Sequence, residues 1–447
     1  HEYCSFFAER STQYATGPAS DQYRTNAPSS PSTPMAALLL EANATVTMTH
    51  IHTRDTRFIV NEVLDLASYG NLPGFENATP DMIDTVINEA GKFCAEVLAP
   101  VNQAGDEHGC TRHEDGSVTT PPGFKEAYQA FVENGWGTLG QPVEFGGQGL
   151  PHVINIAMEE FQATANQAFA MYPGLAGAAV SAILVAGSEE QKQTYVPNIV
   201  SGKWAGTMNL TEPHCGTDLG MIRTRAEPQA DGSYKISGTK IFISGGDQDL
   251  TENIVHLVLA KTPGAPDSTK GISLFIVPKF LVNKDGSLGD KNAVSCGSIE
   301  HKMGIRGSAT CVMNYDGATG YLVGEEHKGL AAMFIMMNIA RLGVGQQGLG
   351  IAEVAYQNAV HYAQDRRQGR ALTGPQDLEQ KADTLFVHPD VRRMLMDAKA
   401  FTEGMRALCL WGALQADLLH HAQTEEERQT ADDLLSLLTP VIKGYGT

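Results

Sequence analysis

The sequence is poor in cysteine and basic residues, and it contains no unbroken apolar run of membrane-spanning length. Its seven cysteines are dispersed, and no C-x-x-C pair or Cys/His cluster has metal-ligand spacing, so we predict free thiols in a reducing compartment and no metal site. Lys and Arg number 32 against 51 acidic residues, for a formal net charge of −19, and they are not clustered. Nucleic acid is therefore a disfavoured partner, because neutralising phosphates needs clustered cations. Since no apolar run reaches roughly 18–20 residues, we also predict no transmembrane segment.

What remains is typical of a large enzyme with a sizeable core. The chain has 447 residues, of which 42% are hydrophobic, and this length favours two to four domains. Residues 1–47 are rich in Ser, Thr, Pro and Ala, so we expect a disordered tail or an upstream extension there, with Met48 as an alternative start. The last residues, 434–443, still follow a helical rhythm, so we expect the native protein to continue past Thr447.

The hydrophobic period changes twice along the chain. Residues 48–204 and 321–447 repeat apolar side chains every three or four positions, as in helices, with a methionine-rich stripe at Met333, Met336 and Met337 that we assign to the core. Residues 205–320 instead alternate in short β-branched runs, with a tight turn predicted at Asp231-Gly232. The sequence therefore predicts an α+β fold in which a small β-domain separates two helical domains.

Two segments of the β-region carry groups suited to a flavin. Met208–Asp218 reads MNLTEPHCGTD, and Gly238–Gly245, about thirty residues later, reads GTKIFISG. They supply main-chain amides, glycines that let the backbone approach a diphosphate, hydroxyl groups, and the flat ring of Phe242. The residues alone leave another interpretation open, in which Thr-Glu-Pro is a plain turn and Phe242 belongs to the core of a strand.

Together the two segments resemble the flavin signature of the acyl-CoA dehydrogenase family, M-x-L-T-E-P-x-x-G-[ST]-D followed by G-x-K-x-[WF]-I-[ST]. The resemblance runs from about Arg54 to Lys443. It implies the family's fold: an N-terminal helical domain, a central small β-barrel or sandwich, and a C-terminal helical bundle, which would be incomplete here. It also implies bound FAD. The residues it assigns to FAD are Met208, Leu210, Thr211, Gly216, Thr217, Phe242, Ile243 and Ser244.

A third segment, Tyr362–Gly369, resembles the family's Y-A-x-x-R-x-Q-F-G pattern without its aromatic residue. The resemblance implies that Arg366 and Gln368 reach the FAD diphosphate of a neighbouring subunit, and that the protein is a homo-oligomer, a dimer or a tetramer. An exposed arginine on a helix face is the alternative that the residues leave open.

The family's reaction is the α,β-dehydrogenation of an acyl-CoA to a 2-enoyl-CoA, and it needs a carboxylate base. Most relatives carry this glutamate in a Y-E-G motif, which is missing here, and no glutamate follows Glu427. The alternative family position, before an Arg-Leu pair, is Ala340. We therefore expect the base beyond Thr447, a supporting role for Arg341, and weak or absent turnover from this chain. The acidic run 425–427 is interpreted as a solvated surface turn.

Segments 242–253, 278–285 and 302–307 are similar to the 3-methylmercaptopropionyl-CoA dehydrogenase branch. This implies a short or medium acyl chain, including a sulfur-containing one as in dimethylsulfoniopropionate (DMSP) demethylation, with Lys302 and Arg306 as candidate CoA contacts. It also implies an electron-transferring flavoprotein as acceptor and a cytoplasmic location, or the mitochondrial matrix in a eukaryote. A non-catalytic flavoprotein and an acyl-CoA oxidase remain alternative functions.

Overall fold

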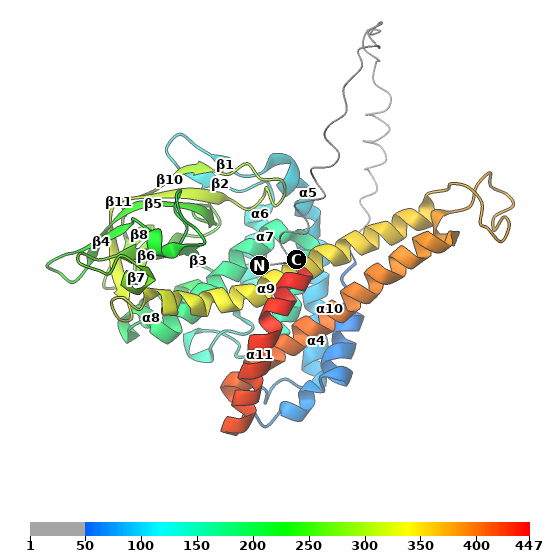
Figure 1. Cartoon of the computed structure of the whole chain (residues 1–447), viewed down its shortest axis with the longest axis horizontal. Coiled ribbons are helices and arrows are strands. Elements are labelled where there is room, and N and C mark those ends of the chain that lie inside the picture. The colour runs from blue at the N-terminus through cyan, green and yellow to red at the C-terminus, as the bar shows by residue number, and fades with distance from the viewer. Residues whose placement is uncertain (1–49) are drawn as a thin grey trace, which may run out of the picture. The chain divides into compact units, whose positions relative to one another are not determined.

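The computed structural model describes residues 50–447, so the predicted tail at 1–47 lies outside the described residues. The described chain runs through helices, then strands, then helices, as Figure 1 shows, and the predicted α+β class is confirmed. The helices are α3 (Thr53–Phe58), α4 (Pro80–Phe93), α5 (Ala99–His108), α6 (Phe124–Glu133), α7 (His152–Ala186), α8 (Glu189–Val200), α9 (Gly329–Asp365), α10 (Pro389–His421) and α11 (Glu425–Gly446). The strands are β1 (Thr111–Arg112), β2 (Val118–Thr119), β3 (Trp204–Asn209), β4 (Arg225–Pro228), β5 (Tyr234–Ser244), β6 (Asn253–Lys261), β7 (Ile272–Pro278), β8 (Phe280–Val282), β9 (Leu288–Lys291), β10 (Val294–Ile299) and β11 (Thr310–Val323).

Helix α7 is the central helix of the fold, since it packs against α4, α5, α8, α9, α10 and strand β3. It is two helical stretches joined at Asn166, whose backbone leaves the helical region (φ −160°, ψ 88°). The Asn166 side chain repairs the break, because its Oδ1 accepts a hydrogen bond from the amide of Phe169 at 3.0 Å. The backbone of Asn166 therefore causes the kink, and the side chain of the same residue caps the helical stretch that follows.

Helices α7 and α9 bear on the prediction of no transmembrane segment. Each contains an 18-residue window, of mean hydropathy 1.8 and 1.2 respectively, that by length and composition alone could cross a membrane. The prediction of no transmembrane segment considered only unbroken apolar runs and overlooked them. In the fold, the two helices pack against each other, and α7 also contacts β3 while α9 contacts β7. Their apolar surface thus contributes to the protein core.

The β-domain closes on itself through its strand pairing. Strands β11, β5, β4 and β6 are neighbours in that order, and β7 pairs with both β6 and β11, which completes a small ring. Strand β3 lies outside the ring, paired in parallel with β6. The predicted hairpin turn at Asp231-Gly232 joins β4 to β5, with Gly232 at φ 85°. Alternate residues of β6 face the helices and the interior of the ring, so both faces of this strand are buried.

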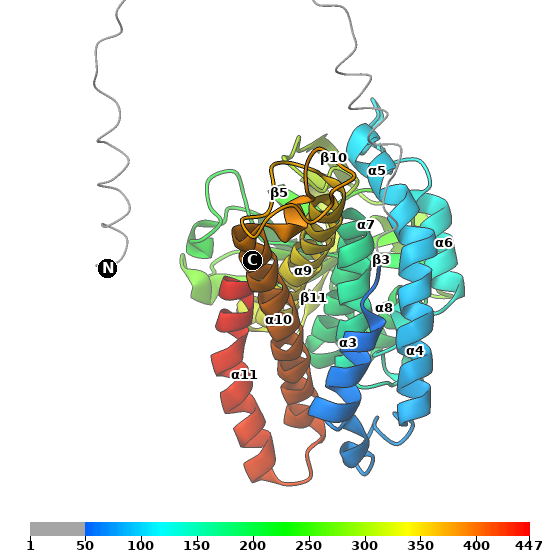
Figure 2. The same ribbon diagram turned by 90° about the vertical axis from the view of Figure 1, so that its right-hand side faces the viewer.

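The C-terminal helices depend on glycine for close packing. In Figure 2, α10 and α11 lie beside α9, and the residue contacts agree. On α9, Gly350 lies against the backbone of α7 at Ala163 and Thr164, and Gly348 lies against the carbonyl oxygen of Gly446 on α11. Only residues without a side chain allow such close approach. The methionine stripe earlier on α9 is buried at Met333 and Met336, as predicted.

A buried ion cluster joins the same helices. Arg406 of α10 is fully buried, and it donates to Glu160 of α7 at 2.7 Å and to Glu353 of α9 at 2.8 Å. His52 extends the cluster with a 3.0 Å contact to Glu353. Burial alone would raise the pKa of Glu353, but hydrogen bonds from His52 and Arg406 hold it at about 2. The cluster fixes which faces of the three helices meet, because any other register would leave a charge buried and unpaired.

The glycine contacts predict opposite effects of one substitution at two positions of α9. Gly350→Ala places a Cβ 2.7 Å from that of Ala163 and should destabilise the fold by about 1–3 kcal/mol through overpacking. Gly343→Ala meets only Oε2 of Glu159, at 3.7 Å, and should be neutral or stabilising by up to about 1 kcal/mol. Urea unfolding of both variants checks this. Equal effects at the two positions would contradict the packing argument.

Candidate functional site

The two motif segments are held together by a buried ion pair. The carboxylate of Glu212 lies 2.8 Å from the ammonium of Lys240 on β5, and both side chains are buried. Lys240 also donates to the carbonyl oxygen of Leu210 at 2.9 Å, and Glu212 accepts from the amide of Arg223 and from Thr224. Burial opposes ionisation of Glu212, but Lys240 and these donors hold its pKa below the usual value. The pair fixes the loop after β3 against β5.

The same loop leaves several polar groups free. Leu210 and Met208 are half-buried, packed on the apolar cluster that α7 and α9 share with the sheet. Thr211 lies beside Gly216, since a Cβ on that glycine would come within 3.2 Å of the threonine methyl group. Gly216 and Thr217 are exposed, and neither threonine hydroxyl bonds to any group within residues 50–447. The loop therefore presents hydroxyls and glycine backbone outward.

Phe242 has the most strained backbone of the motif segments. Its φ is 61°, a left-handed conformation that costs a residue with a Cβ about 1–2 kcal/mol. The strand register against β11 shifts at this point, and Phe242 is 59% exposed. A large aromatic residue held strained and exposed at a strand irregularity indicates a functional constraint.

The neighbours of Phe242 point in different directions. Ile243 is buried among the apolar residues inside the ring of strands, so only its main chain is available to a cofactor. The predicted contact of Ile243 with FAD is therefore limited to its main-chain atoms. Ser244 is half-buried, pairs with Thr310 through the strand backbone, and makes no side-chain hydrogen bond with any described residue. Its hydroxyl thus remains free on the same strand as the exposed ring.

The two predicted CoA-binding cations differ in their contacts with the fold. The ammonium of Lys302 donates to the carbonyl oxygen of Ser308 at 2.7 Å, and burial lowers its pKa. Arg306 lies 3.9 Å from Asp106 at the end of α5. The same loop is held by Tyr172 of α7, whose hydroxyl donates to the Gly307 carbonyl at 3.1 Å and accepts from the Ala309 amide at 3.0 Å. Sequence reasoning missed Tyr172, because an aromatic residue in a helix gives no signal of a distant loop.

Family models describe both halves of this arrangement. The N-terminal domain model of acyl-CoA dehydrogenases matches residues 82–203, and the middle domain model matches residues 207–318, together more than half of the chain. The chain belongs to the acyl-CoA dehydrogenase family. The second match contains the loop of Glu212 and the strand of Phe242, so the geometry described above lies within the family's middle domain.

Named relatives agree with the family. The 3-methylmercaptopropionyl-CoA dehydrogenase of Ruegeria pomeroyi is 46% identical over 394 residues, which cover 88% of this chain and 66% of that protein. A butyryl-CoA dehydrogenase of Syntrophomonas wolfei is 38% identical over 404 residues, with the same coverage. The chain thus spans just under two thirds of the length of these curated relatives.

Solved structures share the fold. An acyl-CoA dehydrogenase of Bacillus anthracis complexed with FAD aligns with a TM-score of 0.65 at 23% identity, over 82% of this chain and 57% of that one. The butyryl-CoA dehydrogenase of Megasphaera elsdenii aligns with a TM-score of 0.61 at 23% identity, over 82% of this chain and 89% of that one. At these identities the likeness concerns the fold alone.

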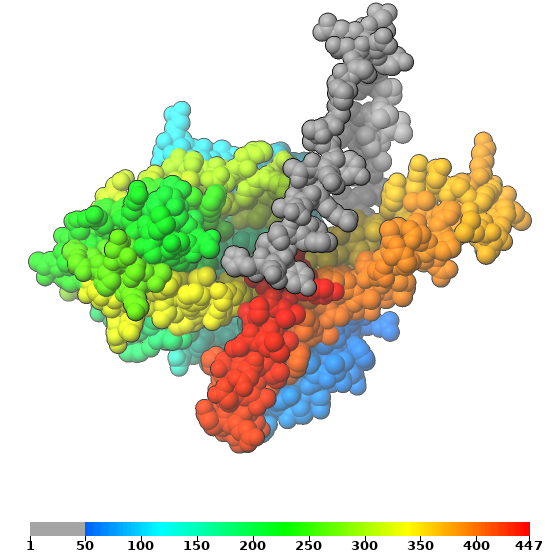
Figure 3. Space-filling model, viewed as in Figure 1, coloured from blue at the N-terminus to red at the C-terminus, as the bar shows by residue number. Residues whose placement is uncertain are grey.

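Arg366 and Gln368 lie far from the rest of the acyl-CoA dehydrogenase motif. They follow the last residue of α9, and both are exposed. The first residue of α9, Gly329, packs on β7 of the β-domain, and a helix of 37 residues is about 55 Å long. Figure 3 shows the green β-domain and the yellow-orange segment after α9 at opposite ends of the visible face. One chain therefore does not bring Arg366 and Gln368 to its own Phe242.

None of the predicted site residues in the described part of the chain is a carboxylate that could act as the base. Arg341 bonds Asn338 at 3.0 Å and lies over the ring of Phe334, beside Ala340. One turn further along α9, Gly343 faces Glu159 of α7, a carboxyl whose pKa burial raises to about 7. Sequence reasoning overlooked Glu159, because Glu159-Glu160 in an apolar helix matches no catalytic motif. The acidic run 425–427 forms the exposed first turn of α11, in agreement with the predicted surface position.

One further cluster departs from the sequence prediction of no metal-ligand group. Ligand atoms of Glu212, His214 and Cys215 lie within 4.8 Å of one another. Both oxygens of Glu212 already accept hydrogen bonds, and Lys240 places a positive charge beside them. A metal cation would meet that charge directly, so this grouping is explained by the ion pair that holds the loop.

Lys240→Met should destabilise the fold by about 3–5 kcal/mol, because it leaves the Glu212 carboxylate buried and unpaired. Adding Glu212→Gln should recover part of this loss. Lys235→Met on the same strand is the matched control, since Lys235 is exposed, and it should change stability little. Thermal unfolding of the four proteins checks the prediction, which fails if both lysine variants behave alike.

Proposed function

We propose that the chain binds FAD and takes part in the α,β-dehydrogenation of a short or medium acyl-CoA. The observation that carries the proposal is the exposed Phe242, whose backbone is strained, two residues before the free hydroxyl of Ser244. A flavin ring needs a flat apolar surface and a hydroxyl donor near its hydride-accepting nitrogen, and these two residues meet that need. Family membership supports the assignment.

The remaining groups fit the other parts of FAD. Main-chain amides at Met208 and Leu210, with the hydroxyl of Thr211, suit the polar edge of the ring. The exposed Gly216 and Thr217 suit the diphosphate, since glycine lets the backbone come close. Bound FAD supplies the acceptor for the hydride that leaves the β-carbon of the substrate.

Arg366 and Gln368 complete the proposed site from a second copy of the chain. Their exposure and their distance from Phe242 within one chain support this role. A guanidinium suits a diphosphate because it donates two parallel hydrogen bonds. We therefore propose a homo-oligomer, a dimer or a tetramer, whose FAD sites are shared between chains.

The proton chemistry requires a carboxylate base, and none of the residues assigned here supplies it, because Ala340 cannot accept a proton. Arg341 is proposed as a supporting residue. We propose an electron-transferring flavoprotein as acceptor and a cytoplasmic location, in keeping with the bacterial relatives. The name of the Ruegeria relative favours 3-methylmercaptopropionyl-CoA as one substrate.

An anaerobic titration tests the function. Residues 1–447 are purified with FAD and mixed with butyryl-CoA or 3-methylmercaptopropionyl-CoA while the absorbance of oxidised flavin is followed. We expect a yellow protein that bleaches little, since removing a base typically costs on the order of 10²–10⁴ in rate. Rapid bleaching would place a competent base inside this chain, and Glu159→Gln would then test the half-buried carboxyl of Glu159. A protein that takes up no FAD would refute the proposal.

Phe242 offers a second test. Phe242→Gly relieves the left-handed strain but removes the ring, so stability should hold or rise while FAD affinity falls roughly tenfold. Phe242→Trp keeps a flat ring and should bind FAD within about threefold of the original protein. Fluorescence titration with FAD measures both variants. If Phe242→Gly binds FAD normally, the ring does not contact the cofactor.

A further inference from the structure

Strand β3 ends at the segment proposed to face FAD, and its backbone is supported on one side only. Among the described strands, β3 pairs through its ladder with β6 alone. An edge strand has a row of backbone groups without a neighbouring strand, so its position is less restrained than that of a central strand. Lys240 holds the carbonyl of Leu210 on one side of this end. A second restraint lies inside the ring of strands.

That restraint is a line of four buried polar side chains. The hydroxyl of Tyr315 on β11 donates to Oδ1 of Asn209 at 2.8 Å. Nδ2 of Asn209 donates to the hydroxyl of Thr207 at 2.9 Å, and this hydroxyl lies 2.7 Å from Nδ1 of His256 on β6. All four residues are at most 1% exposed. The line joins β11 to β3, two strands that share no backbone ladder.

The direction of the hydrogen bonds follows from the donors. Asn209 accepts from Tyr315 and donates to Thr207, so the threonine proton is free to go to Nδ1 of His256. Burial lowers the pKa of His256 to about 3, so the ring is neutral and carries one proton. Nε2 is buried without a partner among the described residues, and an unsatisfied buried polar atom costs stability.

We propose that Tyr315, through Asn209 and Thr207, is a positioning residue that sets the end of β3 against the FAD ring. The inference rests on the proposed FAD site. Asn209 lies between Met208 and Leu210, whose amides are assigned to the polar edge of the ring. Without the Tyr315 bond, the strand end keeps its ladder to β6 and the Lys240 contact but loses its tie across the interior, so the amides are held less firmly. FAD must then order this segment when it binds, which weakens affinity.

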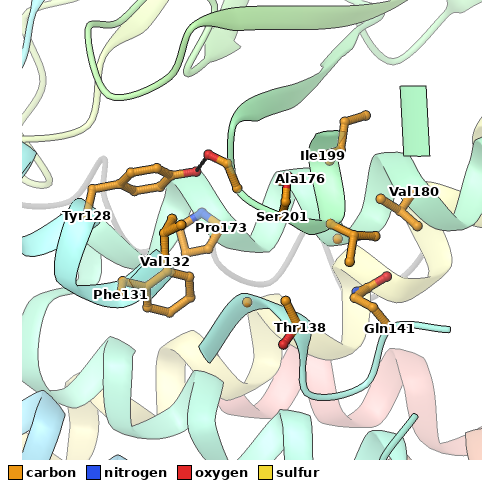
Figure 4. Close-up of a pocket in the computed structure, with 14 residues that line it drawn as sticks. Tyr128, Phe131, Val132, Thr138, Gln141, Pro173, Ala176, Val180, Ile199 and Ser201 are labelled. Carbon is orange, nitrogen blue, oxygen red and sulfur yellow. Dashed lines mark hydrogen bonds between the residues drawn. The ribbon is translucent and has the colours of Figure 1, made fainter. Parts of the chain in front are cut away.

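The test compares two tyrosines that each lose only a hydroxyl. Tyr315→Phe removes the donor to Asn209. Tyr128→Phe is the control, because Tyr128 of α6 is also buried and donates to the carbonyl of Gly202 at 3.1 Å, before the other end of β3. Figure 4 shows this tyrosine at the edge of a small cavity in the helical domain, with its hydrogen bond dashed. Both variants and the unmodified protein are titrated with FAD, and the visible flavin spectrum and melting temperature are recorded.

We expect Tyr315→Phe to raise the FAD Kd roughly tenfold, the equivalent of one hydrogen bond, and to change the flavin spectrum, while Tyr128→Phe stays within about twofold. Unchanged FAD binding by Tyr315→Phe overturns the positioning role, and so does an equal loss in both variants, which would mark a general effect of stability. If the unmodified protein itself binds no FAD, the proposed function fails and this inference fails with it.

A second pair of variants checks the inner part of the line. Thr207→Val keeps the shape but removes the hydroxyl, and it should weaken FAD binding as Tyr315→Phe does. Thr207→Ser keeps the hydroxyl and should restore affinity to within about threefold. Equal affinity of the two threonine variants would show that Thr207 contributes only packing, which also contradicts the proposal.

Discussion

The ion pair between Glu212 and Lys240 is the constraint on which the candidate site depends. The pair joins a loop that follows a strand at the margin of the β-domain to a strand in its ring. Lys240 also holds the carbonyl of Leu210, so the pair restrains both segments on which FAD groups are assigned. Because the pair is buried, it stabilises the site mainly by making other arrangements costly, since each would leave a charge unpaired in an apolar interior. The strain at Phe242 can persist only in such a rigid frame.

In the helical part of the chain, different contacts fix how the elements are aligned with one another. The cluster around Arg406 selects which faces of α7, α9 and α10 meet, and glycines on α9 then allow the helices to approach closely. The charged cluster determines which helix faces meet, and the glycines, which lack side chains, let the helix backbones come close. The charged cluster and the glycines together explain how α9 can contact α7, α10 and α11 along its length.

Much of the fold could be predicted from the sequence, because the hydrophobic period is a local signal. The change of period marked the β-domain, and the motif segments identified the family. Contacts between residues far apart in the sequence could not be predicted, because no local pattern encodes them. Nothing in the sequence shows that Lys302 turns inward, that Tyr172 holds a loop more than one hundred residues away, or that Glu159 faces α9. Likewise, Ile243 belongs to a motif, but strand alternation directs its side chain into the core.

The length of α9 has a thermodynamic consequence. A helix of about 55 Å separates the β-domain end from Arg366, so an FAD site completed by that arginine exists only while two chains are associated. Cofactor binding and self-association would then be linked equilibria, each strengthening the other by the same factor. Dilution would release FAD, and added FAD would draw free chains together. The concentration of the protein itself would thus act as a regulator of its cofactor content.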